Sequence, residues 1–114
     1  MIARVWEGVV PKEKADGYGA YLAGSDRGVA DYQRIPGNRG VLLLRRAEGD
    51  RVRFLLVSLW DSAEAIAAYA GADIDTAQYF PYDRECLVDP PANVKHFEVM
   101  AAAGDLRTPP TRPR

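Results

Sequence analysis

Two adjoining segments of this chain are apolar at nearly every position. Residues 41–44 read VLLL and residues 54–60 read FLLVSLW, with a tight turn through Glu48, Gly49 and Asp50 between them. A hairpin strand with one face in water alternates apolar and polar side chains, and these two strands do not. Both faces of their sheet are therefore expected to be covered, one by the chain's own helices and the other by a second copy of the protein.

The other elements are predicted from hydrophobic periodicity and from turn and capping residues. They are a strand at 2–10, a helix from Pro11 to about Gly24, a helical turn within 28–34, strands at about 38–48 and 51–60, a helix capped by Asp61 or Ser62 and ended by Gly71, a short helix at about 73–79, and a strand at 94–101. Pro81, Pro90 and Pro91 are interpreted as marking irregular chain.

The order strand, helix, strand, strand, helix, strand predicts a ferredoxin-like α+β fold. In that fold a four-stranded antiparallel sheet carries its helices on one face. The other face would be lined by Val and Leu, so we expect a homodimer that closes into a dimeric α+β barrel. Residues 1–102 are expected to form the domain. Residues 103–114 are polar and proline-rich, and a disordered tail is predicted there.

Composition narrows the classes of partner. The chain has 114 residues, of which 47% are hydrophobic and 27% charged, and its formal net charge is -1. Because no basic stripe or acidic block stands out, neither nucleic acid nor a membrane is expected as a partner. No apolar stretch approaches the roughly 18 residues of a membrane helix. The single cysteine, Cys86, has no partner for a disulfide within the chain. A cytoplasmic protein is expected.

Aromatic side chains are the main candidates for a binding pocket. Trp6 lies in the first strand, and Trp60 ends the apolar strand and either walls a pocket or packs the following helix onto the sheet. Tyr69 and Tyr79 are ten residues apart, and Tyr82 follows them. A phenol donates a hydrogen bond to a substrate oxygen and stabilises an enolate. The alternative is a ring in the core with its hydroxyl group in water.

His96 is the only histidine and a candidate general base, because its unperturbed pKa lies near neutrality. The alternative is a hydrogen-bonded structural residue. Asn38 and Arg39 follow a Pro-Gly turn, where they could meet a polar substrate group or serve as turn and surface residues. One histidine and one distant cysteine make no metal site. PGNRG at 36–40 opens a strand rather than a helix, so it is no phosphate-binding loop.

Several segments together resemble a known family. IARVWEG, PGNRGVLLLRR, FLLVSLWDSAEAIAAYAG, YFPYD and VKHFEV, in this order over residues 1–101, resemble the antibiotic biosynthesis monooxygenase superfamily of dimeric α+β barrel proteins. The resemblance implies the fold more than a reaction, because this fold hosts oxygenases, haem degraders, isomerases and members with no known substrate. Oxygenases of this superfamily use no metal, flavin or haem, and an electron-rich phenol or enol supplies the electrons to dioxygen.

The haem-degrading branch of the superfamily relies on an asparagine in strand one, a tryptophan on helix two and a histidine ten residues later. In an alignment on LWDSAEAIAAYAG, the last two positions fall on Tyr69 and Tyr79, and the first falls near Trp6. None of the three residues is present, so haem degradation is disfavoured.

The sequence and the resemblance therefore predict a cofactor-independent monooxygenase that acts with dioxygen on a small aromatic or enolic compound. His96, Tyr69 and Tyr79 are the candidate catalytic residues, and Trp6, Trp60, Asn38, Arg39 and Tyr82 the candidate substrate-binding ones. The alternative is a non-catalytic small-molecule-binding or stress-associated protein on the same fold.

Overall fold

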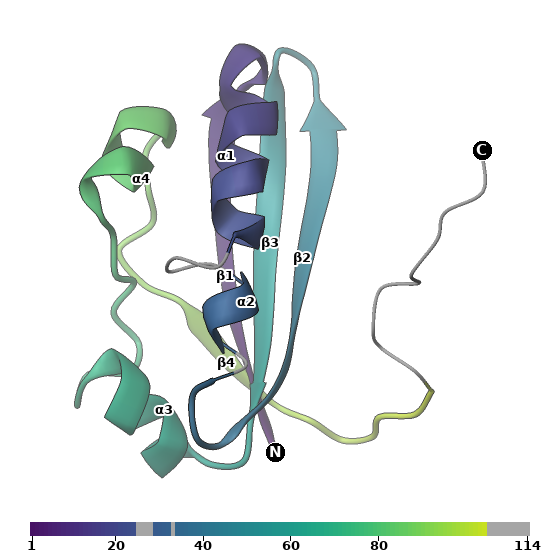
Figure 1. Ribbon diagram of the computed structural model, residues 1–114, viewed down its shortest axis with the longest axis vertical. Helices are drawn as coiled ribbons and strands as arrows, with labels where there is room; N and C mark the ends of the chain where they lie inside the picture. The colour runs from purple at the N-terminus through teal and green to yellow at the C-terminus, as the bar shows by residue number, and fades with distance from the viewer. Residues whose placement is uncertain (25–28, 33, 105–114) are drawn as a thin grey trace.

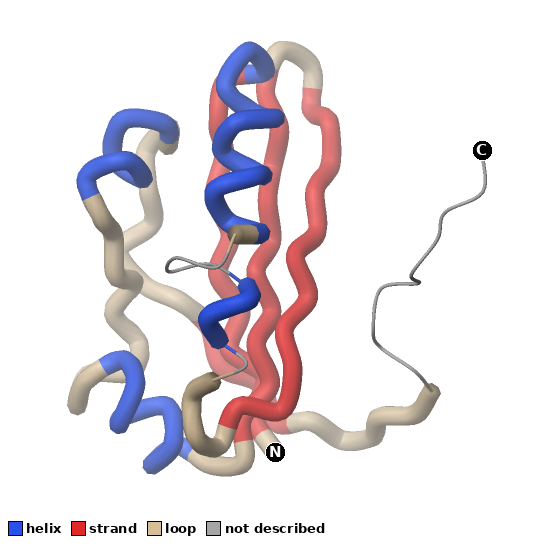
Figure 2. Tube along the Cα trace, in the orientation of Figure 1, coloured by secondary structure: helices blue, strands red, loops and turns tan. Residues whose placement is uncertain are grey.

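The computed structural model describes residues 1–24, 29–32 and 34–104 and shows one four-stranded sheet with helices (Figure 1 and Figure 2). In chain order the elements are β1 (Ile2–Pro11), the 3-10 helix η1 (Lys12–Lys14), α1 (Ala15–Ala23), α2 (Val29–Tyr32), β2 (Asn38–Glu48), β3 (Arg51–Trp60), α3 (Ala63–Ala70), α4 (Pro81–Cys86) and β4 (Lys95–Glu98). The sheet order is β2-β3-β1-β4, with every pair antiparallel. The predicted ferredoxin-like α+β class is confirmed.

One face of the sheet is covered by helices. Alternate residues of β3 point to this face, and Phe54, Ser58 and Trp60 are buried there. α1 and α2 cross the face in front of the strands in Figure 1, whereas α3 and α4 lie to one side. The intervening positions of β3 therefore belong to the opposite face.

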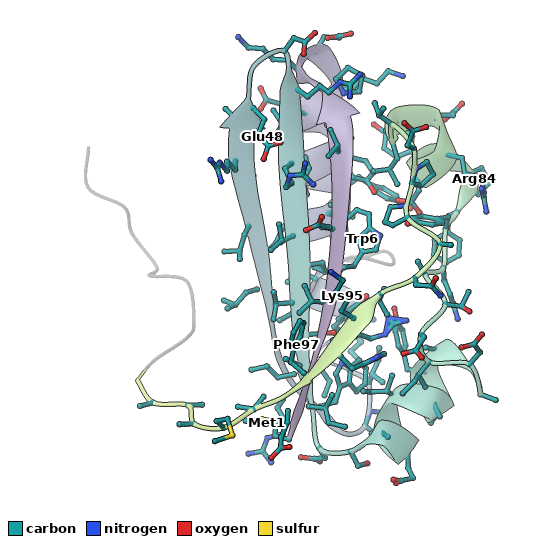
Figure 3. All side chains as sticks on the ribbon, turned by 180° about the vertical axis from the view of Figure 1, so that it is seen from behind. Met1, Trp6, Glu48, Arg84, Lys95 and Phe97 are labelled. Atoms are coloured by element: carbon teal, nitrogen blue, oxygen red, sulfur yellow. The ribbon has the colours of Figure 1, made fainter. Side chains whose placement is uncertain are left out.

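The opposite face, here called the open face, is apolar at its centre. The strand register places on it Val5, Val9, Leu42, Leu44, Leu55, Val57, Leu59 and Phe97. Among them Leu44 is 47% exposed and Phe97 53%. In Figure 3 no helix of the described chain lies over this face. The missing alternation in the sequence thus corresponds to a sheet that is apolar on both sides and covered on only one.

Local capping fixes α3 at the end of β3. The Ser62 hydroxyl accepts a hydrogen bond from the Ala65 amide at 3.2 Å, as expected for an N-cap, and Gly71 ends the helix with a φ of 94°. A Cβ atom on Gly37, whose φ is 86°, would lie 2.5 Å from the Ala65 Cβ. Glycine at 37 therefore lets the turn before β2 pack directly against α3.

Residues 73–79 form no helix, contrary to the sequence prediction. The Asp73 side chain accepts hydrogen bonds from the Asp75 amide at 3.3 Å and from the Thr76 hydroxyl at 2.6 Å. Such local bonds compete with helical backbone bonds. The helix in this region is α4, which begins at Pro81, a favoured residue in a first helical turn. The interpretation of Pro81 as irregular chain is therefore also wrong.

Two elements have other bounds in the structure than the sequence predicts. The helix expected from Pro11 is η1 followed by α1, and the strand expected at 94–101 covers Lys95–Glu98. β4 ends there because Glu98 already pairs with Ile2, the first residue of β1. Of the predicted disordered tail, residues 105–114 lie outside the described part of the chain. No helix among the described residues is long and apolar enough to cross a membrane.

Candidate functional site

A cavity of about 310 Å³ lies on the helix-covered side of the sheet. Its walls come from β1, β3, all four α-helices and the segment before α4. The lining residues are Arg4, Trp6, Tyr18, Tyr21, Leu22, Tyr32, Leu56, Tyr69, Gln78, Tyr79, Phe80 and Asp83. Seven of these twelve are aromatic, so the walls suit a flat ring compound.

Trp6 and Tyr79 form one hydrogen-bonded wall. The Trp6 indole Nε1 donates to the Tyr79 hydroxyl oxygen at 3.0 Å, and that hydroxyl donates to the Pro91 carbonyl at 2.5 Å. In Figure 3 Trp6 projects from β1 on the side where α4 lies. Burial, the largest cause, raises the pKa of Tyr79. Tyr79 is thus a protonated phenol at neutral pH whose own proton is already donated to a carbonyl.

Gly8 sets the direction of the Trp6 ring. A Cβ atom on Gly8 would lie 2.5 Å from two carbon atoms of the indole and 2.7 Å from a Leu87 methyl carbon. Because glycine has no side chain, the indole can lie along β1 with Leu87 beside it. The strand glycine is therefore part of what positions the cavity wall.

Asp83 on α4 joins two elements at one end of the cavity. Its carboxylate accepts from the Tyr18 hydroxyl at 2.8 Å and from the Phe80 amide at 2.8 Å. Only 6% of Asp83 and none of Tyr18 is exposed. Burial and then the hydrogen bond to Asp83 raise the pKa of Tyr18 above its ordinary range. Tyr18 therefore remains protonated and holds α4 against α1.

Tyr32 and Tyr69 form a second phenol pair. The two rings meet edge to face at 5.2 Å, and Tyr69 also stacks on Trp60 at 5.3 Å. Burial raises the pKa of Tyr32, and the charge of Tyr69 and a hydrogen bond to it raise it further. Tyr32 therefore keeps its proton at neutral pH, and the two rings together form the cavity wall at this end of α3.

These raised pKa values predict a loss of stability in alkali. The unfolded chain releases tyrosine protons above about pH 10, whereas folded Tyr18 and Tyr32 still hold theirs. Their contribution to the free energy of unfolding is complete below about pH 10 and is lost as pH rises above it. Denaturant unfolding from about pH 8 to about pH 11 should show this fall, and Tyr18→Phe should lessen its slope. Ionisation of every tyrosine with circular dichroism unchanged would contradict it.

Arg4 brings a charge into the cavity. It is 7% exposed, and its Nη2 donates to the Thr76 carbonyl at 3.2 Å. In the register of β1 and β4, Arg4 lies opposite His96. The His96 Nδ1 is 3.0 Å from an Asp75 carboxylate oxygen. Arg4 Nε and His96 Nε2 are both buried, and neither has a hydrogen-bond partner among the described residues.

The structure brings three of the predicted site residues, Trp6, Tyr69 and Tyr79, into one cavity. His96 does not line it, although it lies beside Arg4, which does. Trp60 is fully buried beneath Tyr69, and its Nε1 donates to the Ser58 hydroxyl at 2.8 Å.

Three further candidates lie outside the lining. The Asn38 side chain accepts from the Gly40 amide at 3.1 Å, and Arg39 pairs with Asp61 at 3.1 Å on the surface. The Tyr82 ring contacts Tyr21 at 4.8 Å. The parts that these three residues play in binding stay predictions.

Nine of the twelve lining residues were missed from the sequence, and the four of them described above are Arg4, Tyr18, Tyr32 and Asp83. Strand alternation already places Arg4 on the face of Trp6, and a charge on an otherwise apolar face could have drawn attention to it. Tyr18 lies in the first helix, where an aromatic residue with helical spacing to Leu22 is typical of an ordinary core position. Asp83 carried no sequence signal, because its partner Tyr18 is 65 residues away. Among the described residues no group of three or more His, Cys, Asp or Glu side chains could hold a metal ion.

Comparison with known proteins bears on the fold. No protein-family model and no curated protein sequence matches the chain. The haem degrader MhuD from Mycobacterium tuberculosis, solved with two haems bound in its active site, matches with a TM-score of 0.58 and 24% identity over 91% of this chain and 100% of that one.

Two provisionally assigned antibiotic biosynthesis monooxygenases also match. The one from Bacillus cereus has a TM-score of 0.59 and 12% identity over 94% of this chain and 98% of its own. The one from Bordetella bronchiseptica has a TM-score of 0.52 and 23% identity over 88% and 97%. At these identities the likeness establishes the fold. The chain has the fold of the antibiotic biosynthesis monooxygenase superfamily.

Proposed function

We propose that this protein is a cofactor-independent monooxygenase that oxidises a small aromatic or enolic compound in the cavity. The observation that carries the proposal is the cavity wall, in which seven of twelve residues are aromatic and several present a phenol. Its volume of about 310 Å³ suits a small ring system. The fold shared with provisionally assigned monooxygenases supports the reaction class.

In the proposed reaction the substrate supplies every electron. A phenol or enol first loses a proton to a base, and the resulting anion transfers an electron to dioxygen. For an anthrone-type substrate, one methylene group and one dioxygen molecule give one carbonyl group and one water molecule, so atoms and electrons balance. The apolar walls keep water away from the reactive intermediates.

The proposed proton acceptor is His96. An ionised Asp75 only accepts hydrogen bonds, so the His96 Nδ1 at 3.0 Å carries the proton and Nε2 keeps its lone pair. Because His96 does not line the cavity, the proton would pass through one bridging water molecule. Tyr79 is not the proposed base, since burial raises its pKa and keeps its phenol protonated at neutral pH.

Tyr69 is the proposed hydrogen-bond donor to the substrate oxygen. It lines the cavity and is 38% exposed, so it stands at the mouth of the cavity. Trp6 and Tyr79 are proposed as the opposite wall. In this arrangement the substrate ring lies against the aromatic wall while its oxygen meets the phenol.

The test is oxygen uptake with a panel of anthrones, hydroquinones and related polyphenols, measured with and without air and after metal removal. Uptake should survive metal removal, and Tyr69→Phe or His96→Ala should slow it about tenfold or more. Ala68→Ser, which changes an exposed neighbour of Tyr69 on α3, is the matched control. Activity that requires NADH, flavin or iron would reject the mechanism. Tight binding without turnover would support the alternative of a small-molecule-binding protein.

The residues present do not fit haem. No histidine lines the cavity among the described residues, and Tyr69 and Tyr79 occupy the positions aligned with the tryptophan and histidine of the haem-degrading branch. The Tyr79 oxygen, the nearest substitute for an iron ligand, already bonds to Trp6 and Pro91. Similarity to a haem degrader at 24% identity therefore carries no haem chemistry to this chain.

We accordingly expect no saturable haem binding. Titration of haem into the purified protein should give no Soret shift that saturates at one haem per chain. Incubation with haem and ascorbate should give no biliverdin-like product. A stoichiometric Soret shift that is lost in Tyr79→Phe would show that this tyrosine ligates iron and would contradict the expectation.

A homodimer formed through the open face is also proposed. Leu44 and Phe97 expose apolar surface there, and no element of the described chain covers it. The cavity lies on the other side of the sheet, so each protomer would keep its own binding site.

A further inference from the structure

The strongest unexplained feature of the cavity is the side chain of Arg4. A guanidinium carries a permanent charge and five N–H donors, and burying one without partners is costly. Arg4 is 93% buried, given its exposed fraction of 7%. Its Nη2 meets only a neutral carbonyl, that of Thr76, and its Nε has no hydrogen-bond partner among the described residues.

Two carboxylates, that of Asp83 in the cavity lining and that of Asp75 beside His96, already have hydrogen-bond partners. Asp83 accepts from Tyr18 and from the Phe80 amide, and Asp75 lies 3.0 Å from His96. His96, directly opposite Arg4 in the register, is neutral or positive and adds no compensating charge. The guanidinium therefore lines the cavity without forming an ion pair with either carboxylate.

We propose that Arg4 binds an anionic oxygen of the ligand, so that the cavity selects aromatic phenolates or enolates over neutral rings. The proposal rests on the proposed function, because it names the substrate class for the same cavity. The aromatic wall would hold the ring, and the guanidinium would hold the charge by a charge-assisted hydrogen bond. A neutral ring would leave the buried charge unpaired, and this penalty is the source of selectivity.

The arrangement has a chemical consequence for the ligand. A positive charge beside a phenol favours its ionised form. Other titratable groups also line the cavity, namely Tyr18 and Tyr21 from α1, Tyr32 from α2, Tyr69 from α3, Tyr79 before α4 and Asp83 from α4, and His96 from β4 lies beside Arg4 without lining it. Of these only the negative charge of Asp83 opposes ionisation of the ligand. The Asp83 carboxylate already accepts hydrogen bonds from the Tyr18 hydroxyl and the Phe80 amide. Ionisation of the ligand would thus be easier in the cavity than in water.

The test uses 4-nitrophenol, whose phenolate absorbs visible light and whose phenol ionises near neutral pH. Absorbance titration of the protein-bound probe should give a lower apparent pKa than that of the free probe. 4-Nitroanisole, which cannot ionise, should bind about tenfold or more weakly than the phenolate. 4-Nitrobenzoate distinguishes a general anion site from a phenolate site, and stronger binding of this carboxylate would overturn the phenolate assignment.

Arg4→Met should abolish the shift in the apparent pKa of the probe and weaken phenolate binding about tenfold or more. Its binding of 4-nitroanisole should not weaken. Arg51→Met, at an exposed position at the start of β3, is the matched control. If Arg4→Met does not fold, the wild-type titration decides alone, and an unchanged or raised apparent pKa overturns the proposal. Because 4-nitrophenol reports binding without turnover, a shift with no polyphenol oxidation would reject the proposed monooxygenase and keep the anion site.

Discussion

Val57→Asp should turn the proposed homodimer into a monomer. Val57 lies in the middle strand pair of the open face, with Val5 on one side and Leu42 on the other. A stable interface buries more than about 1,000 Å² in total and excludes charge from its centre. In an interface with two-fold symmetry one substitution places a carboxylate in both protomers, so the cost is incurred twice. We expect the dimer to weaken at least about a hundredfold.

Light scattering at micromolar concentration measures the effect. Ala68→Asp, which places the same charge at an exposed position on α3, should leave the dimer intact. Circular dichroism should show that Val57→Asp stays folded, since position 57 does not face the helices. A wild-type protein that is monomeric at this concentration would refute the dimer, and a dimeric Val57→Asp would refute the open face as its interface.

Asp83→Ala should lower the free energy of unfolding by about 3 kcal/mol, because it leaves the buried Tyr18 hydroxyl without an acceptor and removes the bond from the Phe80 amide at the start of α4. For a domain of this size the melting temperature should fall by about 10 °C. Thermal and denaturant unfolding measure both quantities. α4 would also lose its link to α1, so the cavity should bind its ligand less tightly.

A double-mutant cycle separates this mechanism from simple loss of packing. Tyr18→Phe removes the hydroxyl and should cost about 1 kcal/mol in the wild type, where a hydrogen bond is lost. In the Asp83→Ala background the same change should cost less or become stabilising, since it removes an unsatisfied donor. Equal effects of Tyr18→Phe in the two backgrounds would show that the pair is not coupled.

The strands and α3 were predictable because their causes are local. The bounds 38–48 and 51–60 follow from two apolar runs around a glycine turn, and the structure shows the same bounds. Ser62 caps α3 as predicted, through its bond to the Ala65 amide. Trp6 shares its cavity-side face with Arg4, as strand periodicity requires.

What escaped prediction depends on groups distant in sequence. Tyr79 is fixed by Trp6, 73 residues away, and by Pro91, whereas Tyr18 is fixed by Asp83. No local pattern encodes such pairs. The helix expected at 73–79 is absent for a local reason. The Asp73 side chain accepts hydrogen bonds that compete with the backbone bonds of a helix. The candidate site was therefore found in three of its seven aromatic lining residues and missed in its two charged ones, Arg4 and Asp83.

Neighbouring positions along β3 face different surfaces, one set the cavity side and the other the open face. Leu56 lines the cavity and Phe54 and Ser58 are buried on its side, whereas Leu55, Val57 and Leu59 point to the open face. In the proposed arrangement, substitutions in the first set would be selected for their effect on ligand binding. Substitutions in the second set would be selected for their effect on the dimer interface. A single substitution would therefore change one surface without changing the other. An insertion of one residue at the Gly49 turn that shifted β3 by one position would instead move each set of side chains to the opposite face. The cavity and the open face can therefore evolve separately as long as the length of this hairpin stays constant.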